Sequence, residues 1–255
     1  MPLKLLSIPC LKDNYAFLLH DPESGSTALV DAPEAAPILT ALRERGWTLS
    51  QILLTHHHSD HVAGTAEIVA ATGARVLGGA DDAHRLPPLD AQLREGDTVT
   101  VGTEKGTVLA VPGHTIGHIG FHFPLSKLAF TGDSLMAGGC GRLFEGTPKL
   151  MWGTLSKLMT LPPDTLICSG HEYTASNLLF AATVDKDNPA LVERIEATSV
   201  AVRDGKPTVP SPLSLELATN PFLRAGQPAL AAALGMAGAS APQVFAALRS
   251  RKDRF

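Results

Sequence analysis

Four side chains of the kinds that bind metal ions fall within six residues of this chain: His56, His58, Asp60 and His61. They follow the short apolar run Ile52–Leu54, which is typical of a buried strand. A polar cluster directly after a buried strand has no ordinary packing role, because buried polar groups need partners. We therefore expect the fold to hold this loop at the end of a sheet and to bring further ligands to it.

The same arrangement recurs along the first two-thirds of the chain. Short apolar runs, each bounded by a turn rich in Gly, Pro, His or Asp, predict strands at Tyr15–Leu19, Thr27–Val30, Ile52–Leu54, Val108–Val111, Leu128–Phe130 and Leu166–Cys168. Three of these runs lead to a further candidate ligand, in turn His114, Asp133 and His171. Loops that are held by a rigid sheet are common positions for functional side chains.

Helical patterns lie between the strands and after them. Ala35–Arg45 and Asp60–Thr72 are each followed by a glycine, as helix ends often are. After residue 173 the sequence predicts no strand, and it predicts helices at Ala175–Thr183, Ala190–Arg203, Pro228–Leu234 and Pro242–Arg251. We therefore expect a sheet-containing catalytic domain at 1–173 and a helical domain at 174–255.

Alternation along the loop divides the cluster between two ions. On an extended chain His56 and His58 point the same way and can bind one ion, whereas His57 points away from it. Asp60 and His61 lie past the bend and can face a second ion.

The three later strand-end residues complete the predicted site. His114 and His171 would each complete the ligands of one ion, and the carboxylate of Asp133 could bridge the two ions. Imidazole nitrogen and carboxylate oxygen suit zinc and similar metals, so we expect two divalent ions, foremost Zn²⁺ with Fe or Mn as alternatives. Two ions about 3.5–4 Å apart are the usual arrangement for hydrolysis by an activated water. Asp31, at an earlier strand end, is a candidate acceptor for a ligand histidine, and His118 is expected to be structural.

Composition and charge exclude several classes of protein. Hydrophobic residues make up 44% of the chain and charged residues 18%, which is typical of a globular protein. The net charge of −4 provides no broad basic surface for nucleic acid or an anionic membrane. No apolar run approaches the ~20 residues of a membrane-spanning helix. Three cysteines without Cys-x-x-Cys spacing indicate reduced thiols, so we expect a cytoplasmic protein.

Four segments carry a resemblance to a known family. They are Thr-His-His-His-Ser-Asp-His at 55–61, Pro-Gly-His-Thr at 112–115, Thr-Gly-Asp-Ser at 131–134 and Gly-His-Glu-Tyr at 170–173. With them the sequence resembles the metallo-β-lactamase superfamily. The resemblance implies an α+β fold, an αββα sandwich with its metals at one edge of the two sheets, here followed by a C-terminal helical domain. Members cleave lactams, thioesters, lactones and phosphodiesters, so the fold does not select the substrate.

Further segments resemble the glyoxalase II family, the hydroxyacylglutathione hydrolases, from about residue 8 to residue 255. They are Asp-Asn-Tyr at 13–15, Gly-Cys-Gly-Arg at 139–142, Phe-Glu-Gly-Thr at 144–147, Gly-His-Glu-Tyr-Thr at 170–174, Asn-Pro-Phe-Leu-Arg at 220–224 and Leu-Arg-Ser-Arg-Lys-Asp at 248–253. This resemblance implies a thioesterase that cleaves S-(2-hydroxyacyl)glutathione with a metal-bridging hydroxide. The typical substrate is S-D-lactoylglutathione, which gives glutathione and D-lactate in the second step of methylglyoxal detoxification. Besides binding metal, Asp60 would orient the hydroxide and Asp133 would be catalytic.

The resemblance also implies a binding site for glutathione in the helical domain. Arg249 and Lys252 share one face of the last helix and, with Arg142, would bind a glutathione carboxylate. On the residues alone, a basic helix end that complements the helix dipole is an equal alternative. Tyr173 would donate its hydroxyl to the glutathione backbone. Phe144 also falls in this site; many members have Tyr at this position, and they often have Lys where this chain has Arg142. The expected partner is this small molecule, bound by a monomer without nucleic acid or membrane.

Three other functions remain open from the sequence. A sulfur dioxygenase of the same superfamily would use one iron to oxidise glutathione persulfide, but the presence of Asp60 and His171 favours two metals. An RNA phosphodiesterase is disfavoured by the net acidity. A non-catalytic, metal-stabilised interaction protein would lose its fold on chelation and would hydrolyse no thioester.

Overall fold

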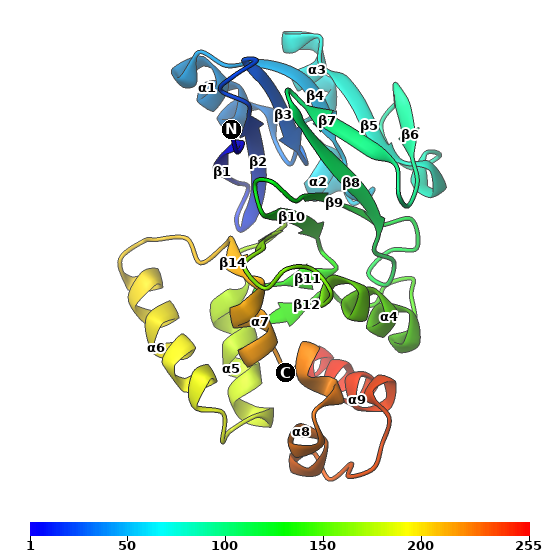
Figure 1. Cartoon of the computed structure of the whole chain (residues 1–255), viewed down its shortest axis with the longest axis vertical. Helices are drawn as coiled ribbons and strands as arrows, with labels where there is room; N and C mark the ends of the chain where they lie inside the picture. The colour runs from blue at the N-terminus through cyan, green and yellow to red at the C-terminus, as the bar shows by residue number, and fades with distance from the viewer. The chain divides into compact units, whose positions relative to one another are not determined.

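The computed structural model describes all 255 residues, Met1–Phe255 (Figure 1). The chain forms two compact units. The first contains residues 1–111 and 116–132, and the second contains residues 112–115 and 133–255. None of the helices combines the length and the apolar character that crossing a lipid bilayer requires.

A six-stranded mixed sheet organises the first unit. Its strands follow the order β1 (Lys4–Cys10), β2 (Asn14–His20), β3 (Ser26–Val30), β4 (Thr48–Leu53), β5 (Arg75–Gly79) and β6 (Ala91–Leu93). Neighbours are antiparallel from β1 to β3 and parallel from β3 to β6. Parallel neighbours need a crossover, and helices between β3 and β5 provide two of them.

The helices of the first unit cover one face of this sheet. α1 (Ala35–Arg45) has the predicted bounds and ends at Gly46, whose φ of 64° is the left-handed conformation that favours glycine. Ile38 of α1 and Ile68 of α3 (Thr65–Thr72) are fully buried in one core with Leu18 of β2. Burial of this apolar face stabilises the helices against the sheet.

The single helix predicted at Asp60–Thr72 is wrong. The structure has a short α2 (Ser59–Val62) followed by α3, with a break at Gly64. The Gly64 N–H donates to the carbonyl of Ala32, 2.8 Å away. A Cβ at this glycine would lie 2.7 Å from the carbonyl carbon of Glu34. The close approach of the two backbones at Gly64 therefore accompanies the break between α2 and α3.

The other face of the sheet packs on an antiparallel meander. Its strands are β7 (Thr98–Val101), β8 (Glu104–Ala110), β9 (Ile119–Phe123) and β10 (Leu128–Gly132). The 3₁₀ turn η1 (Ala80–Asp82) comes earlier in the chain, between β5 and β6. Phe17 of β2 meets Phe130 of β10 edge to face, with ring centroids 5.4 Å apart. Phe17 and Leu18 point to opposite faces, so one strand contributes to both layers of core.

The second unit consists mainly of helices, with two short strand pairs. Its elements are β11 (Leu135–Met136), β12 (Gly139–Cys140), α4 (Pro148–Leu158), β13 (Leu166–Ser169), α5 (Thr174–Val184), α6 (Pro189–Arg203), β14 (Ser211–Pro212), α7 (Leu213–Thr219), η2 (Leu223–Gly226), α8 (Pro228–Ala233) and α9 (Ala241–Asp253). The four helices predicted after residue 173 are confirmed, with ends that differ by one or two residues. Stacked and edge-on contacts of Phe180, Phe222 and Phe245 form the centre of its core.

The prediction that no strand follows residue 173 is wrong. β14 pairs antiparallel with β13 through Ile167 and Ser211. α7 follows it at once, within the Pro-rich stretch 206–221 that separates the predicted helices. A strand of two residues cannot show alternation in a sequence, which explains the difference.

Candidate metal centre

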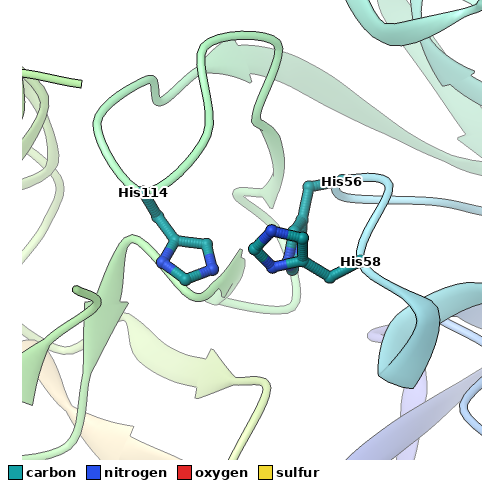
Figure 2. A group of neighbouring side chains, drawn as sticks. All are labelled: His56, His58 and His114. Atoms are coloured by element: carbon teal, nitrogen blue, oxygen red, sulfur yellow. The ribbon is translucent and has the colours of Figure 1, made fainter. Parts of the chain in front are cut away.

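The His-rich loop lies directly after β4, as predicted. Leu54 and Thr55 continue the buried strand end, and His58 is the residue before α2. The imidazole rings of His56 and His58 lie next to each other, with Nε2 of the first 3.2 Å from Nδ1 of the second (Figure 2). The prediction that alternation would bring these two side chains together is confirmed.

Asp31 holds both the start and the end of this loop. Its Oδ1 accepts the backbone N–H of Thr55, and its Oδ2 accepts from the Thr55 hydroxyl and from Nδ1 of His61, each at 2.8 Å. His61 is fully buried, and a carboxylate at Nδ1 favours the tautomer with its proton on Nδ1 and its lone pair on Nε2. The predicted contact between Asp31 and a candidate ligand histidine is therefore confirmed.

The carboxylate of Asp60 is more accessible than its neighbours. Its side chain is 40% exposed, and its Oδ2 lies 3.8 Å from Nε2 of His61. Asn14 donates through its side-chain amide to this Oδ2 at 3.1 Å and to the Asp60 backbone carbonyl at 2.9 Å. This amide orients the carboxylate.

His57 has a partner outside the pair His56 and His58, as predicted, although its ring also lies edge-on to that of His58, with centroids 4.9 Å apart. Its Nδ1 lies 3.0 Å from Oδ2 of the buried Asp82, which also pairs with Arg85. On the other side of the loop, the buried ring of His118 stacks on His56 with centroids 4.5 Å apart. The loop is thus held from both sides by residues that are not themselves candidate ligands.

The second unit holds the other three candidate ligands. His114 lies on the loop between β8 and β9 (Figure 2), and Asp133 and His171 follow β10 and β13. Oδ2 of Asp133 lies 3.5 Å from Nε2 of His114 and 3.3 Å from Nε2 of His171. All three residues are at most 5% exposed. Nδ1 of His114 is 2.8 Å from the Arg142 carbonyl, which directs the Nε2 lone pair toward the carboxylate.

These donors fit divalent metal ions. Two imidazole nitrogens 3.2 Å apart in one unit, and a buried carboxylate oxygen between two imidazoles in the other, are the ligand types that divalent zinc, iron and manganese share. The histidines and aspartates form groups that can hold such ions.

The cationic residues predicted for the substrate lie together in the second unit. Arg249 is buried; its Nη1 donates to the Cys140 carbonyl at 2.9 Å, and its Nη2 lies 2.9 Å from Asp253. The exposed Arg142 also reaches Asp253, at 3.7 Å. Lys252 donates to the Ser176 carbonyl at 3.0 Å, and burial, followed by the Arg249 charge, lowers the pKa of this lysine. Asp253 therefore holds the two arginines in place.

The two aromatic candidates contact candidate ligands. The Tyr173 ring stacks on His171 with centroids 4.7 Å apart. Phe144 packs edge-on against His114 at 5.2 Å, and its own backbone N–H donates to the His114 carbonyl. Phe144 is 62% exposed, so it covers one side of the imidazole and presents an apolar surface to solvent.

Sequence reasoning gave no role at the site to Asn14 or Asp82. Both are buried polar residues that hold a part of the His-rich loop. Asn14 lies in the Asp-Asn-Tyr segment that resembles the glyoxalase II family, and this resemblance is a sequence signal that could have identified Asn14 as a site residue. Asp82 lies in an ordinary-looking Asp-Asp pair, and only the fold shows that it faces His57.

Comparisons with known proteins agree with the fold. Residues 15–171 match the family model of the metallo-beta-lactamase superfamily, and residues 172–255 match that of the hydroxyacylglutathione hydrolase C-terminus. The chain is 66% identical over 255 residues to a hydroxyacylglutathione hydrolase of Cereibacter sphaeroides, with 100% of both chains covered. It is 60% identical to one of Jannaschia sp., covering 99% of this chain and 98% of that one.

Solved structures show the same fold. The BLEG-1 B3 metallo-beta-lactamase superposes with a TM-score of 0.68 at 21% identity, over 86% of this chain and 99% of that one. TTHA1623 in a di-iron-bound form superposes with a TM-score of 0.63 at 26% identity, over 86% of this chain and 100% of that one. The predicted α+β, metallo-β-lactamase-like fold with C-terminal helices is therefore confirmed. The chain belongs to the metallo-β-lactamase superfamily and, within it, to the hydroxyacylglutathione hydrolase family of enzymes.

Proposed function

We propose that this enzyme hydrolyses the thioester of S-(2-hydroxyacyl)glutathione, with S-D-lactoylglutathione as the typical substrate. The products are glutathione and D-lactate, which places the reaction as the second step of methylglyoxal detoxification. The observation that carries the proposal is sequence similarity over the full length to relatives named hydroxyacylglutathione hydrolase, at 66% and 60% identity. This similarity includes the helical C-terminal part. That part distinguishes the family from the rest of the superfamily.

The ligand assignment is part of the proposal. His56, His58 and His114 would hold one ion, Asp60, His61 and His171 the other, and Asp133 would contact both. Zn²⁺ is the first choice, with Fe and Mn as alternatives that accept the same donors. When bound, two such ions supply Lewis acidity toward the thioester carbonyl and acidify a water. The fixed proton on His61 and the buried Asp133 carboxylate support this assignment.

The protein's own groups then have separate roles. Asp60, held by Asn14, accepts a hydrogen bond from the attacking water and orients it toward the carbonyl carbon. Asp133 keeps a negative charge between two imidazoles and so sets their positions. The leaving glutathione thiol has a pKa of about 8.5, so the thiolate departs without a dedicated acid.

We assign recognition of glutathione to Arg142, Phe144, Tyr173, Arg249 and Lys252. Ion pairs of Arg249 and Arg142 with the Asp253 carboxylate support this assignment. An incoming glycyl carboxylate would compete with Asp253 or share its cations. The partly exposed Tyr173 offers a hydroxyl, and Phe144 offers an apolar surface.

The functional division of the chain follows from this assignment. Residues 1–173 would be the catalytic domain and residues 174–255 the helical substrate-binding domain. We propose a monomer that acts on a small molecule without nucleic acid or membrane. The three cysteines are free and buried, which suits a reducing compartment such as the cytoplasm.

The test is hydrolysis of S-D-lactoylglutathione, followed by release of free thiol and of D-lactate. A thioester of lactate with N-acetylcysteamine, which lacks the glutathione carboxylates, is the matched control substrate. We expect the control substrate to show a much higher KM. Equal kcat/KM for both substrates would contradict glutathione recognition. Oxygen uptake with glutathione persulfide, without thioester hydrolysis, would contradict the proposal and indicate a sulfur dioxygenase instead.

A further inference from the structure

A buried hairpin follows Asp133 in the chain. β11 and β12 pair through Leu135 with Cys140 and through Met136 with Gly139, and we call residues 135–140 the hairpin. All six residues are buried. With two residues in each strand, the ladder leaves several backbone groups of the hairpin without a strand partner.

Side chains from the C-terminal helices satisfy these groups. The Asn220 side-chain amide donates to the carbonyls of Met136 and Gly139, at 3.2 and 2.9 Å. Oε2 of Glu216 on α7 accepts the N–H of Gly138 at 2.8 Å. Asn177 of α5 donates to Ala137 at 3.0 Å, and Arg249 of α9 donates to Cys140 at 2.9 Å. Side chains of the C-terminal part thus hold a backbone group of each residue from 136 to 140.

The charge that Glu216 brings is itself compensated. Arg194 of α6 pairs with Oε1 of Glu216 and also donates to the hydroxyls of Thr219 and Ser211. Oε2 of Glu216 accepts from the Asn220 amide at 3.0 Å as well. Both charged residues are at most 5% exposed, so removing one partner leaves an uncompensated buried charge. Asn220 and Glu216 therefore belong to one hydrogen-bonded network.

The ends of the hairpin meet at two candidate ligands. The Gly141 N–H donates to the Ser134 carbonyl at 3.3 Å, which joins the exit of the hairpin to its entry. A Cβ at Gly141 would lie 1.9 Å from the Asp133 carbonyl oxygen and 3.0 Å from Nδ1 of His114. The next residue, Arg142, presents the carbonyl that Nδ1 of His114 contacts. A displacement of the hairpin would therefore move both Asp133 and the partner of His114.

We propose that Asn220 and Glu216 are positioning residues for the metal centre. They hold the 135–140 hairpin so that the Asp133 carboxylate and the His114 imidazole keep one geometry. The proposal rests on the proposed function, because it takes both residues as metal ligands. It gives the helical C-terminal part a second role besides substrate binding, in which α7 and the residue after it shape the catalytic unit.

The test compares Asn220→Ala with Asn188→Ala. Asn188 is the control, since it is a buried amide of the same unit that donates to one backbone carbonyl and one carboxylate, whereas Asn220 donates to two carbonyls and one carboxylate. Neither bond of the Asn188 amide goes to the hairpin. Both variants should lower the Tm of the metal-free protein. Only Asn220→Ala should reduce bound Zn²⁺ per folded chain, reduce the rise in Tm on adding Zn²⁺, and change the visible spectrum of the Co²⁺-substituted protein.

Kinetics provide the second comparison. Loss of a group that orients metal ligands typically costs 10–100-fold in affinity or activity, so we expect kcat of Asn220→Ala to fall by roughly 10-fold or more. KM should change little, and Asn188→Ala should keep kcat within about 2-fold of the wild type. If Asn220→Ala does not fold, Asn177→Ala, which removes one hairpin hydrogen bond, should show the same spectral change to a smaller extent.

The outcomes separate the two claims. Equal metal content, Co²⁺ spectra and kcat in the Asn220 and Asn188 variants would overturn the positioning role. Unchanged spectra in a folded Asn177→Ala would do the same where Asn220→Ala is insoluble. A wild type that binds two ions but hydrolyses no thioester would overturn the proposed function, and the metal readouts would still decide on the hairpin. A wild type that binds no metal would overturn both.

Discussion

Oδ2 of Asp31 lies 2.8 Å from Nδ1 of His61, at the fully buried end of the His-rich loop. The same oxygen also accepts the Thr55 hydroxyl, so one carboxylate fixes both the first residue of the loop and its last histidine. Asp31 has a φ of 58°, a conformation that L residues other than Asn and Asp rarely adopt. The backbone there is bent so that the carboxylate meets the loop.

Asp31→Asn should weaken metal binding more than it weakens the fold. An amide at this position can donate to Nδ1 of His61, which favours the tautomer that carries its proton on Nε2 and cannot ligate. We expect an affinity loss on the order of 10–100-fold at one ion, with partial recovery of activity in excess Zn²⁺. Metal titration monitored by activity and bound zinc checks this. The exposed Asp81→Asn is the control, and equal affinities in the two variants would contradict the role.

His57 and His58 are neighbours with opposite expected effects. His57→Ala removes a partner of the buried Asp82, so we expect a loss of about 1–3 kcal/mol in the free energy of unfolding while both ions stay bound. His58→Ala should lose close to one ion per chain and most of the activity. Urea unfolding and metal analysis of both variants test the pair. Loss of an ion from His57→Ala would contradict the assignment of His57 as a structural residue that binds no metal.

The binding of glutathione should weaken in alkali because of Lys252. Burial, followed by the Arg249 charge, lowers the pKa of Lys252 below its usual 10.5. The lysine is charged below this lowered pKa and loses its charge as the pH rises through it. As the pH increases, KM for S-D-lactoylglutathione should therefore begin to rise at a lower pH than it would if Lys252 had the pKa of an ordinary lysine. Lys252→Arg keeps its charge in this range, so its KM should stay flat. Parallel KM profiles, corrected for spontaneous hydrolysis, would argue against a contact between Lys252 and the substrate.

Asp21 should make the first unit sensitive to acid. The Glu23 N–H first, and then the Thr103 N–H and the Ser24 hydroxyl, lower the pKa of Asp21 to about 2. Its contribution to stability is complete above the unfolded value of about 3.9 and is lost as the pH falls toward 2. The difference in Tm between metal-free wild type and Asp21→Asn should therefore shrink over this window. A difference that is constant from pH 5 to pH 2 would refute the assignment, and the exposed Asp187→Asn should leave Tm nearly unchanged throughout.

Local signals decide the parts of the first unit that the sequence predicts, which are α1 and the strands β2, β3, β4, β8 and β10, whereas β1, β5, β6, β7 and β9 are not predicted. α1 ends at a glycine in the left-handed conformation, and each predicted strand stops at a turn residue. The orientation of His57 follows from alternation on an extended loop, and Asp31 lies at a strand end beside that loop. These features depend on neighbouring residues, so the pattern along the chain is sufficient to find them.

The parts that the sequence does not predict depend on distant contacts. The break between α2 and α3 comes from the approach of Gly64 to Glu34, and β14 is too short to show a pattern. Glu216 and Asn220 look like ordinary polar residues at the end of a helix. Their role follows only from the buried backbone groups of the hairpin, about 80 residues earlier in the chain.

The most direct test of the account is a Zn²⁺ titration of the metal-free wild type, with bound metal per chain and release of D-lactate from S-D-lactoylglutathione measured on the same samples. We predict two ions per chain at saturation and thioester hydrolysis that depends on them. Asp133→Ala should lose bound metal and hydrolysis together, because its carboxylate lies against the Nε2 atoms of both His114 and His171. Full hydrolysis by Asp133→Ala with two ions still bound, or by the wild type with no bound metal, would contradict the account.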